Sequence, residues 1–170
     1  MKIFLIGFMG SGKTTAAKKL AERLGCLWDD LDRIIEQGKG MSVAQIFEKE
    51  GEQAFRDLEH HYLTRLDTSA REVIATGGGT PCYHSNMDYM NEAGLTVYLE
   101  LTPEQLYSRL KATPSHRPLL KGMNDEELFR YIVKKLRERA PFYQSAHIRV
   151  CGFDLNVTTL EREICARLKQ

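Results

Sequence analysis

The chain has 170 residues, of which 42% are hydrophobic and 28% are charged, and its 24 lysines and arginines nearly balance its 23 aspartates and glutamates. This length suits one α/β domain over residues 1–170, and a net charge of +1 is too small for a protein that binds nucleic acid through many phosphate contacts. No apolar run is long enough to span a membrane, so we expect neither a nucleic-acid nor a membrane partner.

Predicted strands and helices alternate along the chain. Short apolar runs predict strands at residues 3–6, 26–28, 73–75, 95–99 and 148–150. Helical spacing and capping residues predict helices at residues 14–24, at 31–68 with breaks at Gly38, Gly40 and Gly51, from 103 onward, at 125–139 and at 160–168. This alternation predicts an α/β fold of three layers, in which helices flank a five-stranded parallel sheet.

Two segments depart from simple alternation. The long helical stretch after the second strand, about residues 31–60, is expected to be an insertion in the domain. Residues 111–123 contain two prolines and a glycine, and we expect them to form a lid with little regular structure. The four cysteines have no CxxC spacing and follow no signal peptide, so we expect neutral, unpaired thiols in a cytoplasmic protein and no zinc site.

The strongest motif follows the first predicted strand. Residues 7–14 read G-F-M-G-S-G-K-T and match the phosphate-binding pattern G-x-x-x-x-G-K-[ST] in full. The glycines let successive N–H groups point at the β-phosphate of a nucleotide, and the following helix adds the positive end of its dipole. A glycine-rich turn without a ligand is the alternative, but the motif lies between a strand and a helix, as phosphate loops do. The residues expected to bind ATP here are Gly10, Ser11, Gly12, Lys13, Thr14 and Thr15.

The phosphate loop by itself suits a GTPase, a nucleic-acid motor or a kinase. A GTPase needs a base-reading motif such as N-K-x-D, which the sequence lacks. A motor usually carries an acidic residue at the end of the third strand, whereas here that strand runs into Thr76 and Gly77. The pattern favours a kinase in which Lys13 bridges the β- and γ-phosphates and the Thr14 hydroxyl binds Mg²⁺, with some other residue completing the metal site.

Two carboxylates at the end of the second strand are candidates for that role. Asp30 and Asp32 lie where ligands bind in open α/β sheets. Residues two apart in an extended segment face the same side, so one carboxylate can approach Mg²⁺ while the other approaches a substrate hydroxyl. The alternative is a helix N-terminus that Asp29 or Asp30 merely caps. We adopt the capping interpretation for Asp29 and the functional one for Asp30 and Asp32.

Three arginines also stand out by their positions. Arg117 lies in the expected lid, where it can fold over the phosphates of a nucleotide. Arg56 and Arg139 are far apart in the sequence, and together they can hold a carboxylate through bidentate hydrogen bonds.

Taken together, these segments resemble those of the shikimate kinase family. The segments that carry the resemblance are G-F-M-G-S-G-K-T, D-D-L-D-R-I-I-E, G-E-Q-A-F-R-D-L-E, T-G-G-G, R-P-L-L and R-E-R-A-P-F-Y, in the family's order and spacing from residue 2 to about 150. The resemblance implies a P-loop NTPase fold like that of nucleoside monophosphate kinases. It also implies transfer of the ATP γ-phosphoryl group to the 3-hydroxyl of shikimate, a step of chorismate and aromatic amino acid biosynthesis.

The resemblance further implies roles for single residues. Asp32 would contact the shikimate hydroxyls as base or orienter, and Asp30 would hold Mg²⁺ through water. Arg56 and Arg139 would pair with the shikimate carboxylate, and the insertion near residues 31–60 would bind this substrate. Gly78 and Gly79 would admit the ring, and Arg117 in the lid would contact the ATP phosphates. Glu59 would orient Arg56, and Phe47 and Phe55 would form two apolar walls. Lys13, Asp32 and Arg117 would be the catalytic residues.

One position departs from the family, and alternatives stay open. Many members carry an arginine that packs on adenine seven residues before the R-P-L-L arginine, where this chain has Leu110 between Arg109 and Lys111. A kinase for another small polyol acid such as gluconate, or a non-catalytic binding protein that kept the fold, would also fit parts of the pattern. For any of these we expect a monomer with a small-molecule ligand.

Overall fold

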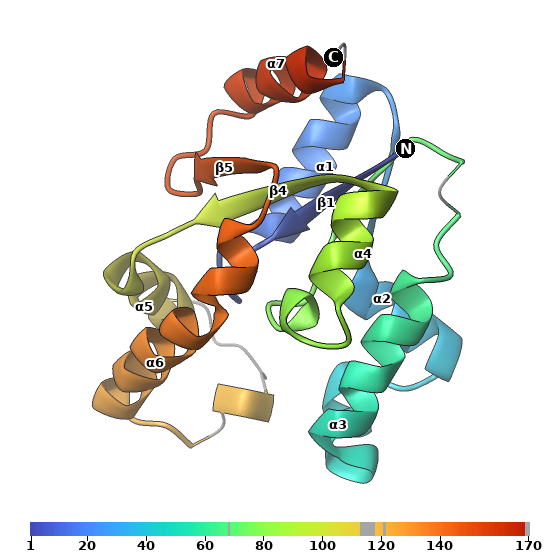
Figure 1. Cartoon of the computed structure of the whole chain (residues 1–170). Helices are drawn as coiled ribbons and strands as arrows, with labels where there is room; N and C mark the ends of the chain where they lie inside the picture. The colour runs from blue at the N-terminus through green and yellow to red at the C-terminus, as the bar shows by residue number, and fades with distance from the viewer. Residues whose placement is uncertain (68, 113–117, 121, 169–170) are drawn as a thin grey trace.

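The fold is described from a computed structural model of the chain, which covers all residues except 68, 113–117, 121 and 169–170 (Figure 1). One sheet forms the centre, and its strands lie in the order β2-β3-β1-β4-β5, with every neighbouring pair parallel. The strands are β1 (Lys2–Ile6), β2 (Leu27–Asp30), β3 (Glu72–Ala75), β4 (Gly94–Glu100) and β5 (Ile148–Cys151). The predicted α/β fold with a five-stranded parallel sheet is confirmed.

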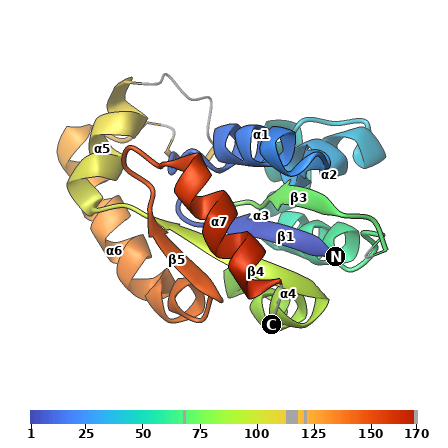
Figure 2. The same cartoon turned by 90° about the horizontal axis from the view of Figure 1, so that it is seen from above.

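Helices cover both faces of the sheet, as Figure 2 shows from above. They are α1 (Lys13–Leu24), α2 (Leu31–Lys39), α3 (Val43–Leu63), α4 (Asn86–Ala93), α5 (Pro103–Ala112), α6 (Asp125–Gln144) and α7 (Val157–Arg167), with short 3₁₀ turns η1 (Thr80–Cys82) and η2 (Pro118–Leu120). Parallel strands need such crossover connections, because the chain must return to the end of the sheet where the previous strand began before the next strand can start. In the part of the chain that the structure describes, no helix has the length and apolar character needed to cross a membrane.

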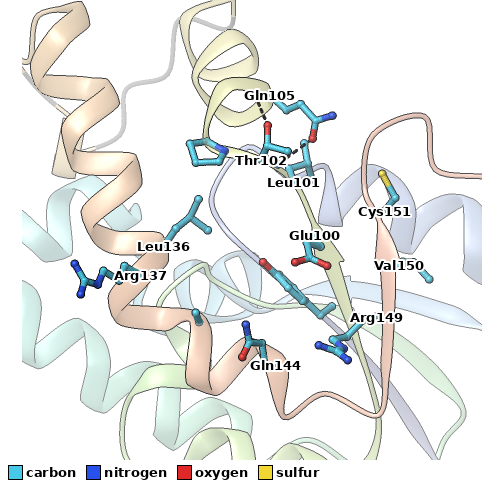
Figure 3. A pocket seen from close by; sticks show the side chains of 13 residues that line it. Glu100, Leu101, Thr102, Gln105, Leu136, Arg137, Gln144, Arg149, Val150 and Cys151 are labelled. Atoms are coloured by element: carbon cyan, nitrogen blue, oxygen red, sulfur yellow. Dashed lines mark hydrogen bonds between the residues drawn. The ribbon is translucent and has the colours of Figure 1, made fainter.

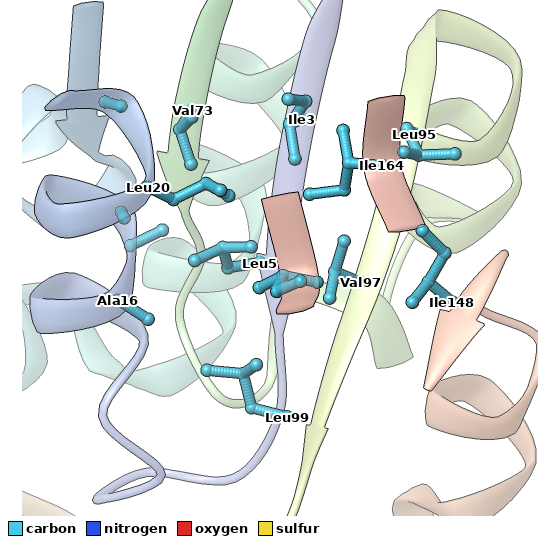
Figure 4. Packing of buried hydrophobic residues seen from close by; sticks show 14 residues of the cluster. Ile3, Leu5, Ala16, Leu20, Val73, Leu95, Val97, Leu99, Ile148 and Ile164 are labelled. Atoms are coloured by element: carbon cyan, nitrogen blue, oxygen red, sulfur yellow. The ribbon is translucent and has the colours of Figure 1, made fainter. Parts of the chain in front are cut away.

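The alternation of side chains along the strands divides the core between the two faces. Ile3 and Leu5 of β1 face α1 and α7, where they pack with Leu20 and Ile164 (Figure 4). Phe4 and Ile6, one residue along in each case, point to the opposite face and pack with α2, α3, α4 and α6. A strand buried on both faces is a continuous apolar run, which is how this segment appears in the sequence.

Two expected helix ends were wrong, and one helix was not predicted. Helix α6 continues through Pro141 to Gln144, because Tyr143 is fully buried and holds the last turn in the core. Helix α4 was missed because it is short and has no capping signal. Its N-cap residue, Ser85, has a left-handed backbone conformation and makes no side-chain hydrogen bond to the helix. The helical stretch expected to reach residue 68 ends at Leu63. The expected break at Gly51 is confirmed, since Gly51 kinks α3 with φ of 85°.

The structure describes the expected insertion in full and the expected lid only in part. Helices α2 and α3 occupy the chain between β2 and β3, so the helical segment expected at about 31–60 extends to Leu63. The residues at the centre of the expected lid, 113–117 together with 121, lie outside the described residues. Arg117 is among them.

Candidate active site

The phosphate loop joins β1 to α1, as its motif predicts. Gly10 and Gly12 have φ values of 81° and 90°, which residues with a β-carbon rarely adopt, so the loop depends on glycine at these positions. Lys13 is 8% exposed, and its Nζ donates hydrogen bonds to the carbonyl oxygens of Gly7 at 2.8 Å and Phe8 at 2.9 Å. The ammonium group therefore lies across the mouth of the loop, where nucleotide phosphates bind in such motifs.

Asp30 links this loop to the end of β2. Its Oδ2 accepts a hydrogen bond from the Thr14 hydroxyl at 2.6 Å, and its Oδ1 accepts one from the Asp32 N–H at 3.1 Å. The expected extended segment is wrong, because β2 ends at Asp30 and α2 begins at Leu31 with Asp30 as its N-cap. Asp29 was expected to cap and instead pairs with Arg33. Asp30 thus caps α2 with one oxygen and faces the phosphate loop with the other.

A cavity of about 110 Å³ lies beside the phosphate loop. Its lining combines residues from distant parts of the chain, including all five that were expected to bind the substrate: Asp32, Arg56, Gly78, Gly79 and Arg139. The expected apolar walls, Phe47 and Phe55, line it as well, with ring centroids 4.9 Å apart. The fold therefore brings together the substrate-site residues that the sequence singled out.

Asp32 projects from the first turn of α2 into this cavity. Its Oδ1 is buried and has no hydrogen-bond partner among the described residues. Burial, together with the negative charges of Asp30 and Glu59, raises the pKa of the Asp32 carboxyl to about 7. A buried carboxyl oxygen without a partner is rare in folded proteins and indicates a group kept ready for a ligand.

The two arginines approach the cavity from α3 and α6, and both are buried. Arg56 is 3% exposed and pairs with Glu59 at 2.7 Å and with Glu52 at 2.8 Å. Burial lowers the pKa of its guanidinium, but these ion pairs outweigh burial and raise it, so the group stays charged. Arg139 is 5% exposed, and its buried Nη1 has no hydrogen-bond partner in the part of the chain that the structure describes. An unsatisfied donor of Arg139 and an unsatisfied acceptor of Asp32 thus lie at the same ligand site.

The glycines after β3 provide the space that this arrangement needs. A β-carbon on Gly79 would lie 2.7 Å from Arg56 Nη1, and one on Gly78 would lie 2.9 Å from the backbone nitrogen of Met9 in the phosphate loop. Neither glycine has positive φ, so what matters is the absent side chain rather than backbone freedom. Tyr143 also fixes this segment, because its hydroxyl donates to the Gly78 carbonyl at 2.5 Å.

A second cavity, of about 320 Å³, opens on the other side of the phosphate loop. Ser11, Gly12 and Thr15 line it together with Arg109 and Asp154. The Arg109 guanidinium donates to the carbonyls of Ser11 at 3.1 Å and Gly152 at 3.2 Å. Leu110 points elsewhere, since it is buried in the core against Phe8 and Met9. Of the two basic neighbours of Leu110, Arg109 is therefore the one that lines the cavity expected to hold the nucleotide.

A larger cavity than these two, of about 580 Å³, lies elsewhere (Figure 3). It opens between β4, β5, α5 and α6, and is rimmed by Glu100, Arg137, Gln144 and Arg149. Among the residues that the structure describes, none of those singled out from the sequence lines it. Size alone does not locate the active site here; the unsatisfied polar atoms beside the phosphate loop do.

Some residues at the site carried no sequence signal. Arg109 and Lys111 were both considered as the basic neighbours of Leu110 that could contact the nucleotide. Only the orientation of α5 shows that Arg109 lines the nucleotide cavity. Thr80 and Tyr143 were not anticipated, because a lone threonine or tyrosine in the sequence does not show that it will contact Glu59 or the Gly78 carbonyl. Their contacts depend on how η1 and the end of α6 meet.

Comparison with known proteins agrees with this geometry. The family model described as shikimate kinase matches residues 9–169. A shikimate kinase from Bacteroides fragilis is 44% identical over 152 residues, which span 89% of this chain and 85% of that protein.

Solved structures are similar over the whole chain. A shikimate kinase from Bacteroides thetaiotaomicron has a TM-score of 0.89 and 36% identity, with 100% of this chain and 99% of that chain covered. A shikimate kinase from Acinetobacter baumannii, solved in complex with shikimate, has a TM-score of 0.82 and 36% identity, with 98% of this chain and 92% of that chain covered. The chain belongs to the shikimate kinase family.

Proposed function

We propose that this chain transfers the γ-phosphoryl group of ATP to the 3-hydroxyl of shikimate, giving shikimate 3-phosphate and ADP. The observation that carries the proposal is the cavity beside the phosphate loop. There a buried carboxyl oxygen of Asp32 and a buried guanidinium nitrogen of Arg139 have no partner within the described ranges of the chain. A ligand that presents a hydroxyl to the first and a carboxylate to the second satisfies both. Shikimate carries both groups on one ring.

Arg56 and Arg139 are proposed to hold the substrate carboxylate. Both guanidinium groups are buried, so a bound carboxylate is removed from water and interacts with them more strongly than it would at the surface. Gly78 and Gly79 let the ring approach the backbone between these arginines and the phosphate loop. This arrangement fixes the ring so that one hydroxyl faces Asp32.

Asp32 is proposed to act as the base. Its raised pKa of about 7 makes it a better proton acceptor than an ordinary aspartate, while leaving much of it ionised at neutral pH. The carboxylate takes the proton of the 3-hydroxyl as the hydroxyl oxygen bonds to the γ-phosphorus. The bond from that phosphorus to the β,γ-bridging oxygen breaks, and ADP leaves with the bridging oxygen. Lys13 offsets the negative charge on the transferring phosphoryl oxygens.

The residues beside the loop fit a magnesium ion. The Thr14 hydroxyl and the Asp30 carboxylate meet at 2.6 Å, and both are the oxygen donors that Mg²⁺ prefers. Thr14 would bind the ion directly and Asp30 through water. When bound, Mg²⁺ neutralises phosphate charge and orients the β- and γ-phosphates.

On the nucleotide side, residues 10–15 are proposed to bind the phosphates. The cavity of about 320 Å³ beside them is proposed to bind the base. Arg109 takes the place beside the base that Leu110 cannot fill. The expected contact of Arg117 with the ATP phosphates concerns a residue outside the described part of the chain, and it stays a prediction. So do the cytoplasmic location and the monomeric state.

None of the four cysteines forms a disulfide, and burial raises the pKa of the Cys82 thiol to about 11.

A coupled assay of ADP release with ATP and Mg²⁺ tests the function. We expect turnover with shikimate and little with gluconate, and a phosphate monoester on the shikimate 3-oxygen by ³¹P NMR. Equal turnover with gluconate would favour the broader polyol-acid kinase. Absence of ADP release with either acid, despite binding of ATP, would favour a non-catalytic binding protein.

A further inference from the structure

Hydrogen bonds join α3 to the segment after β3 in a way that the proposed mechanism does not use. Asn86 is fully buried, and its Nδ2 donates to the Thr80 carbonyl at 2.9 Å. Its Oδ1 lies 2.7 Å from His60 Nδ1. Because the Thr80 carbonyl can only accept, the Asn86 oxygen faces His60, and His60 Nδ1 carries the proton of this bond. The side chain of Asn86 thus ties the segment to α3.

The same segment contacts the groups that hold Arg56. The Thr80 hydroxyl donates to Glu59 Oε1, and the other oxygen of this fully buried carboxylate accepts from Arg56 Nη1 at 2.7 Å. The Tyr83 ring lies against the same guanidinium, with its centroid 4.8 Å from the Arg56 Cζ. Residues 80–86, which we call the support segment, therefore reach Arg56 both through Glu59 and directly.

Backbone torsion angles in the support segment indicate that surrounding contacts hold its conformation. His84 and Ser85 have φ values of 51° and 54°, in the left-handed region that residues with a β-carbon seldom occupy. Two consecutive residues of this kind cost free energy, and they persist only where the surroundings hold them. The Asn86 N–H donates to the Tyr83 carbonyl at 2.9 Å and closes the turn, while the Asn86 side chain anchors it.

We propose that Thr80, Tyr83 and Asn86 are positioning residues that hold the Arg56 guanidinium in place for the substrate carboxylate before the substrate binds. The proposal rests on the proposed function, since it assigns these residues to the carboxylate site of that reaction. Without the Thr80 hydroxyl, a buried Glu59 oxygen loses its donor, and the carboxylate has to turn to find another. Arg56 would then turn with it, because the two groups are paired.

Thr80 offers the sharpest test, because the chain contains a matched control. Thr80 and Thr96 are both fully buried, and both hydroxyls are hydrogen-bonded. The Thr96 hydroxyl donates to Asn91 at 2.6 Å and accepts from the His147 N–H at 3.0 Å, away from Arg56. Valine at either position removes a buried hydroxyl at nearly constant volume. A purely structural role predicts the same consequence at both sites.

The experiment measures KM for shikimate, KM for ATP and kcat for the wild type, Thr80→Val, Thr80→Ser and Thr96→Val. We expect Thr80→Val to raise KM for shikimate about tenfold with KM for ATP unchanged. Thr80→Ser, which keeps the hydroxyl, should restore KM to within about twofold of the wild type, and Thr96→Val should lower thermal stability without a selective change in KM. A KM shift for Thr80→Val no larger than that of Thr96→Val would overturn the proposal.

Coupling to Arg56 gives a second, independent readout. In an Arg56→Ala background, adding Thr80→Val should change KM for shikimate by less than about twofold, because the group it positions is gone. A further tenfold loss would show that Thr80 acts elsewhere and would refute the proposal. If Thr80→Val does not fold, Tyr83→Leu takes its place in the same cycle, with the same expected outcomes. Lack of shikimate turnover by the wild type itself would instead overturn the proposed function, and the positioning role with it.

Discussion

We expect the substitution Asp32→Asn to stabilise the fold while it removes turnover. Asp32 is buried beside Asp30 and Glu59, and its pKa rises from the ordinary 3.8 to about 7. A carboxyl whose pKa is raised by folding binds its proton more tightly in the folded protein than in the unfolded chain. Its contribution therefore favours folding at low pH, and it is lost as the pH rises from about 4 to 7. Above pH 7 the folded protein carries a buried charge that the unfolded chain holds in water.

The size of the effect follows from the change in pKa. At ~1.4 kcal/mol for each pKa unit, the rise from 3.8 to about 7 corresponds to at most about 4 kcal/mol of lost stability above pH 7. Asparagine keeps the shape and removes the charge. For a chain of this length, about 2–4 °C in Tm accompanies each kcal/mol, so we expect Asp32→Asn to raise Tm by at most about 8–16 °C at pH 8 and by little at pH 4. Turnover should fall by about 10²–10⁴ because the base is lost.

Thermal unfolding of the ligand-free protein between pH 4 and 8 measures this directly. The control is Asp88→Asn, the same change at an exposed aspartate of α4, for which no pH-dependent gain is expected. A Tm for Asp32→Asn at or below that of the wild type at pH 8 would refute the reasoning, because it would mean that the ionised Asp32 carboxylate does not destabilise the folded protein. In the same way, substantial turnover by the variant would exclude Asp32 as the base.

Four further tests address the remaining parts of the site. Lys13→Met should lower kcat by at least about a hundredfold while ATP still binds, and near-normal kcat would remove the phosphate-loop interpretation. Arg56→Ala and Arg139→Ala should each cost about 2–5 kcal/mol in kcat/KM for shikimate, and the double variant less than the sum; additive losses would show that they do not serve one carboxylate. Arg109→Leu should raise KM for ATP several-fold and leave KM for shikimate unchanged, and the reverse pattern would contradict its place beside the nucleotide. Chelation of divalent ions should abolish turnover, and Asp30→Asn should raise the Mg²⁺ concentration needed for half-maximal activity, which an unchanged metal requirement would contradict.

The sequence was sufficient wherever a feature depends on neighbouring residues. The phosphate loop needs only a strand, a run of glycines and a helix start, and all three lie within residues 2–24. Strand positions were also predictable, because fully buried parallel strands are continuous apolar runs. Boundaries failed where contacts with distant residues outweighed local preference, as in α6, which continues through Pro141 because Tyr143 is held in the core.

Only the tertiary structure decided which groups meet and how they are charged. Arg56 and Arg139 share a cavity because α3 and α6 meet beside the glycines after β3, a relation that no spacing in the sequence contains. The pKa of Asp32 depends on burial and on the charge of Glu59, which lies on another helix. Leu110 and Arg109 are adjacent in the sequence, yet the orientation of α5 buries one and turns the other toward the nucleotide cavity. Distance, burial and charge arise from packing, and packing is settled by the whole chain.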